Sequence, residues 1–436
     1  MEITRCLKLR LYPNEEQFSL IKKTGGCRRF VYNKFLEEKE RFYNENVKGK
    51  ELTKEEKKIV YKSFKYTTPK ELKEQYEFLK EVPYKALEQS RMDAERAYLD
   101  FFLHGKGKPR FKSRKDGCSF RLTMLSEDLV LEHENLIKIP KIGLVKYSHN
   151  HIPDWFHSKN IEYKNLTVSI MKTGKIFVSI CCQYEATEAK KTYSDGDNQV
   201  IGLDFSPSHC FVSSNGDKSF GYKPFKQKAG HRLAHYQRGL ARKKKGSKNF
   251  FKAKLKVARF EERIANRRRD WAEKESLRLV KKYKVIGVED LNVKGMMAGS
   301  KNAKNYVDVA WHGLVEKLVW KSKFYDCHVV KANKWFASSQ ICHVCGHKNP
   351  AVKDTKIRKW DCPCCETHHD RDVNAAINLK EYALKEISTA GTVGTYACGG
   401  WGNDGGKRFV GVDHSVKQEY SCPVRGGTKP PASCRG

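Results

Sequence analysis

The sequence has no long hydrophobic run. No stretch approaches the 18 consecutive apolar residues that predict a membrane-spanning helix. The N-terminal MEITRCLKLRLYPNEEQ also has no apolar segment like that of a signal peptide. We therefore expect a soluble, cytoplasmic protein. Its 15 cysteines would then be thiols or metal ligands rather than disulfides, because the compartment is reducing.

Acidic residues are scarce relative to basic ones. The 436-residue chain has 51 Asp and Glu against 85 Lys and Arg, a formal net charge of +34. Its 39% hydrophobic and 11% aromatic content suffices for folded domains, which argues against a disordered polycation. This excess of positive charge predicts a polyanionic partner, usually nucleic acid. An anionic membrane would require an amphipathic basic helix or a lipidation signal. The sequence shows no clear case of either, so we expect no membrane partner.

Five of the cysteines fall between residues 342 and 365. CHVCG and CPCC give the spacing C-x2-C-x16-C-x2-C, which is typical of a zinc ribbon. Two residues between ligands let a tight turn direct both thiolates at one tetrahedral ion, and Gly346 suits that turn. Cys364 is interpreted as a spare thiol, although it could replace either neighbour, and His368 is a distant alternative ligand. The predicted zinc ligands are Cys342, Cys345, Cys362 and Cys365.

The N-terminal half combines strand and helix patterns. Residues 11–104 carry apolar residues at three- and four-residue intervals and are predicted to be helical. Residues 1–10 and 118–185 read as strands, with turn signals at HEN and KTGK. This order predicts a β-barrel interrupted by a helical insertion. The polar stretch EATEAKKTYSDGDNQ then predicts a linker and a domain boundary.

The C-terminal half begins with an apolar strand that ends in Asp204, and the chain is expected to fold back through a hairpin at Asn215-Gly216. A short strand of β-branched residues ends in Glu289, and an amphipathic helix and the strand HVVKAN follow it. After the cysteines, DVNAAINLKEYAL predicts a helix. The tail from about residue 386 has no periodicity and is expected to be poorly ordered.

Basic residues concentrate in one segment. Residues 221–271 hold 18 Lys and Arg against 3 Asp and Glu, in a pattern of two long helices around a Gly-Ser break. So few compensating acids favour a surface that follows nucleic-acid phosphates over an ordinary solvated face. The residues assigned to this surface are Arg242, Lys243, Lys244, Lys245, Lys248, Arg267 and Arg268.

Three acids, Asp204, Glu289 and Asp372, each stand at the end of an apolar element. Each alone could be a capping or surface residue, but burying an acid at the edge of a core is costly unless it is paired or binds a cation. Three carboxylates on adjacent strands and a helix start can hold two magnesium ions roughly 4 Å apart, the arrangement that hydrolyses phosphodiesters. Asp372 is preferred to Asp370, because Asp372 shares a helical face with small apolar residues and Asp370 precedes the helix.

Together these motifs resemble the TnpB family, nucleases that are encoded by bacterial insertion sequences and related to type V CRISPR effectors. The resemblance rests on IGLDFS, ARKKKGSKNFFKAKLKVAR, VIGVEDLNVKGM, SSQICHVCG and CPCCETHHDRDVNAAINL. YPNEEQ, CRRFVYNKFLEE and GKPRFKSRK extend it to the N-terminal half. The family's catalytic triad carries over onto Asp204, Glu289 and Asp372, and its zinc ligands onto the four cysteines.

The resemblance implies an α+β multidomain fold. A wedge β-barrel (1–10 and 115–190) would be interrupted in sequence by a helical recognition domain (11–114). An RNase H-like (RuvC) nuclease domain (196–335 and 371–386) would carry an inserted zinc ribbon that binds target nucleic acid (336–370), with a tail at 387–436. It also implies two catalytic magnesium ions, for which manganese would substitute, and one structural zinc.

The partners implied are a guide RNA from the transposon end and double- and single-stranded target DNA, bound by a monomeric ribonucleoprotein. Cleavage would occur beside a short DNA motif, and Lys85 and Gln89, four apart on one predicted helix face, are candidate readers of that motif. Two alternatives remain. A strand-joining transposase would not need a zinc ribbon between its second and third acids, and a non-cleaving RNA-guided repressor would have lost acids of the triad.

Overall fold

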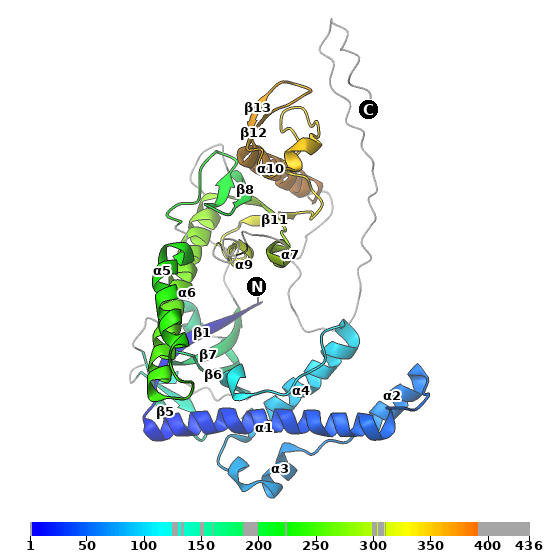
Figure 1. Ribbon diagram of the computed structural model, residues 1–436, viewed down its shortest axis with the longest axis vertical. Helices are drawn as coiled ribbons and strands as arrows, with labels where there is room; N and C mark the ends of the chain where they lie inside the picture. The colour runs from blue at the N-terminus through cyan, green and yellow to red at the C-terminus, as the bar shows by residue number, and fades with distance from the viewer. Residues whose placement is uncertain are drawn as a thin grey trace, which may run out of the picture. The chain divides into compact units, whose positions relative to one another are not determined.

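The computed structural model describes residues 2–123, 130–131, 135–148, 152–158, 160–185, 199–222, 225–298, 303, 309 and 311–390. The chain divides into two compact units, Met1–Thr187 and Glu188–Gly436 (Figure 1). The division falls within the stretch that the sequence predicts to be a linker. The tail expected to be poorly ordered lies, from residue 391 on, outside the described residues. None of the described helices is long and apolar enough to cross a bilayer.

The first unit is built on an antiparallel sheet with the strand order β2-β6-β7-β1-β5-β4-β3. Side chains alternate between the two faces, and in β7 Ile176, Val178 and Ile180 are buried. The predicted strands are confirmed. Because β2 and β3 are the edges of the sheet as described, closure into a barrel stays a prediction. The strands are β1 (Glu2–Tyr12), β2 (Cys118–Thr123), β3 (Val130–Leu131), β4 (Leu136–Ile139), β5 (Gly143–Tyr147), β6 (Glu162–Ile170) and β7 (Ile176–Glu185).

A helical insertion between β1 and β2 is also confirmed, but it begins later than residue 11. The strand β1 continues through Tyr12, and Asn14 caps the first helix in a reciprocal pair with Gln17, whose backbone N–H donates to Asn14 Oδ1 at 2.8 Å. The first helix packs directly on β2 because residue 25 is glycine; a Cβ there would overlap Cys118 Sγ. The helices of the insertion are α1 (Glu15–Asn46), α2 (Lys54–Lys62), α3 (Pro69–Gln75) and α4 (Tyr84–His104), with 3-10 turns at Glu77–Leu79 and Arg114–Asp116. A further 3-10 turn, Asp154–His157, lies between β5 and β6.

The second unit contains a four-stranded sheet in the order β11-β10-β8-β9. The strands β8 (Val200–Ser206), β10 (Val285–Glu289) and β11 (His328–Ala332) run parallel, and β9 (Cys210–Ser213) is antiparallel to β8. One face packs against α6 (Lys248–Lys282) and α9 (Trp311–Ser322) in a shared apolar core. The other face receives α10 (Arg371–Ala390), which Figure 1 shows beside β8 and β11.

Two sequence predictions need correction here. The strand β8 does not end at Asp204 but continues to Ser206, because Phe205 and Ser206 pair with Phe211 and Cys210 of β9. The reversal between β8 and β9 therefore precedes Cys210. The chain does turn at Asn215-Gly216, but this turn follows β9. An isolated antiparallel bridge between Val212 and Lys218 joins the two sides of the turn.

The remaining elements of the second unit match their predictions more closely. The basic segment forms α5 (Phe225–Ala241) and the long helix α6, which lie side by side in Figure 1. The break between them is at Gly246, whose φ is +85°, and Ser247 caps α6 by accepting the Phe250 N–H at 3.1 Å. A short helix α7 (Val293–Ala298) follows β10. The cysteine segment contains a 3-10 turn (Pro350–Lys353) and the hairpin of β12 (Lys359–Asp361) and β13 (His368–Asp370).

Candidate active site and metal centre

Paired glycines bring a helix onto the sheet beside two of the three acids. β8 reads Ile-Gly-Leu-Asp and β10 reads Ile-Gly-Val-Glu, and Gly202 lies directly opposite Gly287 in the parallel register. A Cβ at Gly202 would overlap the Ala376 carbonyl oxygen, and one at Gly287 would overlap the Leu379 carbonyl oxygen. Both glycines therefore allow the backbone of α10 to lie directly on the strands.

The alternation of a strand then fixes where the acids point. Residues two apart share a face, so Asp204 lies on the α10 side with Gly202, and Glu289 lies there with Gly287. The intervening Leu203 and Val288 are buried in the core shared with α6 and α9. Asp372 is the second residue of α10. The structure thus places the three acids, which are far apart in sequence, close enough for their charges to interact.

Burial and mutual repulsion both disfavour the charged forms of the acids in this site. Burial raises the pKa of Asp204 well above its usual value, and the nearby carboxylates of Glu289 and Asp372 raise it further. Burial also raises the pKa of Glu289, while the hydrogen bond from Ser338 and the charge of Arg371 oppose that shift. One buried and two partly buried carboxylates that repel one another fit a site for hard divalent cations, which prefer oxygen ligands.

Asp370 and Asp372 have different roles at the start of α10. The exposed Asp370 caps the helix: its Oδ1 accepts the backbone N–H groups of Asp372 and Val373, both at 3.1 Å. Asp372 is partly buried and accepts from Arg358 Nη1, 3.1 Å from Oδ1. The geometry therefore separates a capping acid from an acid that belongs to the site.

Sequence reasoning missed two neighbours of the acids. Ser338 Oγ donates to Glu289 Oε1, and Ser338 is 3% exposed although it precedes the cysteine cluster in a loop. Arg371 lies between the two aspartates of DRD, and its positive charge opposes the rise in the pKa of both Asp204 and Glu289. No local sequence signal marks Ser338. Arg371 could have been noticed as the one basic residue inside the acidic motif.

The four predicted zinc ligands come together, as expected. The ligand atoms of Cys342, Cys345, Cys362 and Cys365 all lie within 4.8 Å of one another. The Sγ atoms of Cys342 and Cys365, and those of Cys345 and Cys362, are each 3.6 Å apart. Four thiolates around one zinc at 2.3 Å would be separated by about 3.8 Å, so the cluster fits a tetrahedral zinc site. A hydrogen bond with Thr367 lowers the pKa of Cys365 to about 6, which favours the thiolate form.

Neither of the sequence's other candidate ligands joins this cluster. Cys364 is not part of the four-thiol group, and it is disulfide-bonded rather than the spare thiol that the sequence predicts. The exposed His368 contacts Asp361 instead, with Nδ1 2.7 Å from Oδ1. The buried His369, which the sequence reasoning left aside, has its Nε2 3.1 Å from Cys342 Sγ. A ring nitrogen at this distance can orient and stabilise a metal-bound thiolate.

Two turns of the same geometry hold the thiols. In the first, the Gly346 N–H donates to the Cys342 carbonyl at 2.9 Å, and Gly346 has a φ of +77°. In the second, the Glu366 N–H donates to the Cys362 carbonyl at 2.8 Å, and Glu366 has a φ of +57°. The predicted role of Gly346 is therefore confirmed, while its counterpart is a non-glycine residue in the left-handed region.

Two buried asparagines of α10 join the cysteine cluster to the acidic site. Asn374 Nδ2 donates to the Ile341 carbonyl at 2.7 Å, while its Oδ1 accepts the His343 backbone N–H at 3.1 Å. Asn378 Nδ2 donates to the carbonyls of Ser338 at 2.8 Å and Ile341 at 2.6 Å. The residue that donates to Glu289 and the residue before Cys342 are thus anchored to the helix that carries Asp372.

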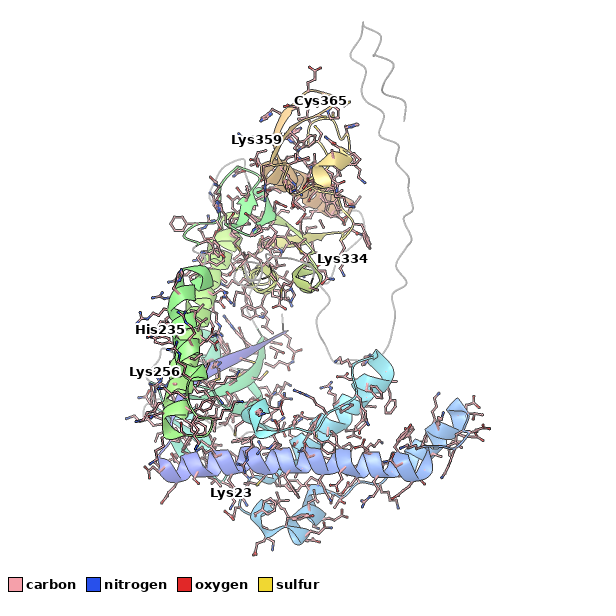
Figure 2. The ribbon with its side chains drawn as sticks, viewed as in Figure 1. Lys23, His235, Lys256, Lys334, Lys359 and Cys365 are labelled. Carbon is pink, nitrogen blue, oxygen red and sulfur yellow. The ribbon has the colours of Figure 1, made fainter. Side chains whose placement is uncertain are left out.

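The predicted phosphate-binding residues lie along the α5–α6 pair. Arg242, Lys243, Lys244 and Lys245 form the exposed turn that connects the two helices. Lys248 and Arg267 are exposed on α6, and Arg268 is partly buried there. Figure 2 marks Lys256 on the same helix, which is also exposed. These positions are accessible to a polyanion, as the prediction requires.

The two candidate DNA-motif readers lie on α4. Lys85 Nζ forms an ion pair with Glu88 at 2.9 Å, and Gln89 Nε2 donates to Asp93 Oδ1 at 3.2 Å. Asp93 in turn pairs with Arg28 of α1. Both side chains are partly buried and already engaged within the first unit, so base contacts would require them to exchange these partners.

Known families match three segments of the chain. Residues 1–48 match a family described as a helix-turn-helix domain, residues 179–299 one described as "Probable transposase", and residues 311–379 the Cas12f1-like TNB domain. In the first of these segments the structure has a strand followed by one continuous helix, α1. The third segment contains α9 and the cysteine cluster.

Full-length relatives match across most of the chain. A Streptomyces pristinaespiralis protein is 32% identical over 87% of this chain and 89% of its own length, and Escherichia coli InsQ is 29% identical over 87% and 92%. Both bear the name "Putative RNA-guided DNA endonuclease". A solved Cas12f1 complex with guide RNA and target DNA aligns over 87% of this chain at 12% identity and a TM-score of 0.49, which is too weak to support an argument.

The chain belongs to the TnpB family of insertion-sequence proteins. The family resemblance drawn from the sequence motifs is confirmed.

Proposed function

We propose that this chain is an RNA-guided DNA endonuclease that hydrolyses phosphodiester bonds at Asp204, Glu289 and Asp372. The observation that carries the proposal is the convergence of these acids, from two strands and a helix, in one negatively charged site. The names of the two relatives that match almost the whole chain support the same activity. The strongly basic composition supports a nucleic-acid substrate.

The donor atoms of the two sites suit different metals. The three carboxylates suit two magnesium ions, or manganese in their place, and the four thiolates suit one zinc. Magnesium held by the acids would supply an activated water and would neutralise charge on the leaving 3′-oxygen. The protein's own contribution is positioning: the strands fix Asp204 and Glu289, Ser338 holds the Glu289 carboxylate, and the Asp370 cap fixes the first turn that presents Asp372.

The remaining parts have roles that follow from family membership. We assign the sheet of the first unit to a wedge domain and its helical insertion to a recognition domain. The second unit is a RuvC-like nuclease domain with an inserted zinc ribbon. A guide RNA from the transposon end would pair with the target strand, with the turn at Arg242–Lys245 and the face of α6 following phosphates in a monomeric complex. The helix α4, with Lys85 and Gln89, would read the flanking DNA motif.

One experiment separates this function from its two alternatives. The protein is co-expressed with RNA from its transposon end, purified, and incubated with magnesium and a plasmid that carries the matching target. We expect a double-strand break at the target. A joined DNA product would instead indicate a strand-transferring transposase, the activity named in one family description. Stable binding without any cut would indicate a guided repressor.

A further inference from the structure

A large cavity in the first unit has no part in the site described above. The residues that line it come mainly from the C-terminal half of α1, from α2 and from the C-terminal half of α4, and its volume is about 1100 Å³. Figure 1 shows the backbone of these three helices. That volume exceeds the roughly 300–1,000 Å³ of typical small-molecule pockets, so one nucleotide with its phosphate would fit. The aromatic side chains that line it are Phe35, Tyr43, Tyr61, Phe64, Tyr66, Tyr98 and Phe102.

These rings already form a connected set with open faces. The centroids of Tyr61 and Phe102 are 5.6 Å apart, and Phe102 stacks on Tyr98 at 6.3 Å with an interplanar angle of 21°. Phe102 nevertheless remains 52% exposed and Tyr43 41% exposed. Large apolar rings are left accessible to solvent here although a buried aromatic cluster lies beneath them. Such a surface is typical of a binding site rather than of a completed core.

Positive charge surrounds the rings. The lysines that line the cavity are Lys39, Lys48, Lys50, Lys57, Lys58 and Lys62. The acid in the lining, Glu95, is already paired with Arg91 at 2.7 Å. Lys39 Nζ lies 4.0 Å from the Phe64 ring centroid, and burial lowers the pKa of this amine. No ion pair with an acid involves Lys48, Lys57, Lys58 or Lys62 within the part of the chain that the structure describes.

Aromatic rings and lysines together indicate which kind of ligand fits the cavity. A second copy of this chain would bring the same six lysines, and the two faces would repel each other. An acidic peptide would match the lysines but would leave the rings without a flat partner. A nucleotide supplies both complements at once, because each unit carries one planar base and one phosphate charge. Base stacking on aromatic side chains beside a basic groove is the general way in which proteins hold single-stranded nucleic acid.

We propose that this cavity binds an unpaired nucleotide, with its base stacked on Phe102 and Tyr61 and its phosphate held by Lys57, Lys58 and Lys62. The proposal rests on the nucleic-acid-binding part of the proposed function and needs no cleavage chemistry. The nucleotide could come from the guide RNA or from unpaired DNA, since both present the same base and phosphate.

Photo-cross-linking of the full-length ribonucleoprotein tests this directly. One sample carries 5-iodouridine in the guide RNA, and the other carries 5-iododeoxyuridine in the target plasmid strands. Cross-linked peptides are identified by mass spectrometry. We expect adducts on the peptides that contain Tyr43, Tyr61 or Phe102, and the sample that yields them identifies the source of the nucleotide.

Two matched variants make the outcome specific. Phe102→Leu removes the stacking ring and should lower the adduct yield about tenfold, given the usual strength of base–aromatic stacking. Phe111→Leu makes the same change at an equally exposed position, 51%, outside the cavity and should leave the yield unchanged. A triple Lys57→Gln, Lys58→Gln, Lys62→Gln variant should also lower it. The corresponding triple change at Lys65, Lys70 and Lys80, which are exposed and do not line the cavity, should not.

Several results would overturn the proposal. Adducts found only outside the cavity, or an equal loss in the Phe102 and Phe111 variants, would show that no base stacks there. A protein–protein cross-link at these rings, or a dimer that Phe102→Leu dissociates, would assign the face to a protein partner. Plasmid cleavage is measured on the same samples. If the plasmid is cleaved but no adducts form in the cavity, only the proposal of a nucleotide site is contradicted. If adducts form in the cavity but the plasmid is not cleaved, only the nuclease assignment is contradicted.

Discussion

At the scale of single residues, the site depends as much on two glycines as on its three acids. Gly202 and Gly287 lie opposite each other and allow α10 to contact the strands, and each acid follows its glycine by two positions on the same face. A larger side chain at either position would push away the helix that carries Asp372. The repeated Ile-Gly-x-acid pattern, visible in the sequence, is therefore the local signal for the site.

The first prediction concerns the choice between the two aspartates of the DRD motif. Asp372→Ala should lower target cleavage at least about a hundredfold, because loss of a metal ligand costs no less than loss of an outer-shell partner. Asp370→Ala should retain most of the cleavage activity, because the helix cap that it removes contributes only about 1 kcal/mol. Plasmid cleavage and binding of the guided complex are measured for both variants. An active Asp372→Ala protein beside an inactive Asp370→Ala protein would reverse the assignment.

The second prediction concerns the charge of Asp204. Its pKa in the fold is raised above the unfolded value, so its contribution to stability is present at low pH and is lost as the pH rises. Without metal, Asp204→Asn should therefore raise the unfolding temperature at pH 8 more than at pH 5. Magnesium should stabilise the wild type at pH 8 by mass action and should stabilise the variant much less. Thermal unfolding with EDTA or with magnesium measures both effects, and equal magnesium shifts in the two proteins would refute the metal site at Asp204.

At the scale of elements, α10 connects the two candidate metal sites. Its first turn carries Asp372, and Asn374 and Asn378 anchor the chain on either side of Cys342. The same chain segment provides Ser338, which donates to Glu289. A folded cysteine cluster thus supports the geometry of the acids through directional hydrogen bonds that are buried or partly buried.

The third prediction concerns zinc. Metal analysis of the purified protein should find about one zinc per chain, since four thiolates close one tetrahedral site. Cys362→Ala should lose the zinc and destabilise the second unit, because metal-binding free energy at such sites is folding free energy. Cys364→Ala, assayed in reducing buffer, is the matched control and should keep its zinc, because Cys364 is not among the four clustered thiols. Loss of zinc from the Cys364 variant would make that residue a ligand.

Much of this arrangement could be predicted from local patterns. The strands that carry Asp204 and Glu289, the helix of Asp372 and the spacing of the cysteines all have periodic or motif signals. The end of β8 could not be predicted, because its last residues are held by β9 rather than by their own propensity. Ser338 and His369 were missed for a similar reason: their roles depend on contacts with residues that are distant in sequence.

At the scale of the whole molecule, charge is distributed unevenly. The α5–α6 segment carries much of the chain's positive excess, and its connecting turn, Arg242 to Lys245, is exposed. The acidic site belongs to the same compact unit. A unit that attracts polyanions over one surface and concentrates carboxylates at another suits an enzyme that holds nucleic acid and cuts it with metal ions.

The fourth prediction concerns that turn. Replacing Arg242, Lys243, Lys244 and Lys245 with Gln should weaken nucleic-acid binding without changing sequence preference, since phosphate contacts carry no sequence information. The slope of log affinity against log salt should flatten by up to about 0.9 for each duplex phosphate that the variant no longer neutralises. A control that exchanges Arg and Lys at the same four positions keeps the charge and should keep the slope. An unchanged slope in the Gln variant would mean that the four residues are only solvated.

An exchange of guide RNAs tests most directly whether RNA directs the cleavage. The protein is purified with either of two guide RNAs that differ only in their targeting segment, and each complex is given a mixture of two plasmids that carry one target each. We predict that each complex linearises only its matching plasmid, that exchanging the guide exchanges the plasmid cut, and that Asp372→Ala complexes cut neither. Cleavage of both plasmids whatever the guide, or of neither by the wild-type complexes, would contradict the account.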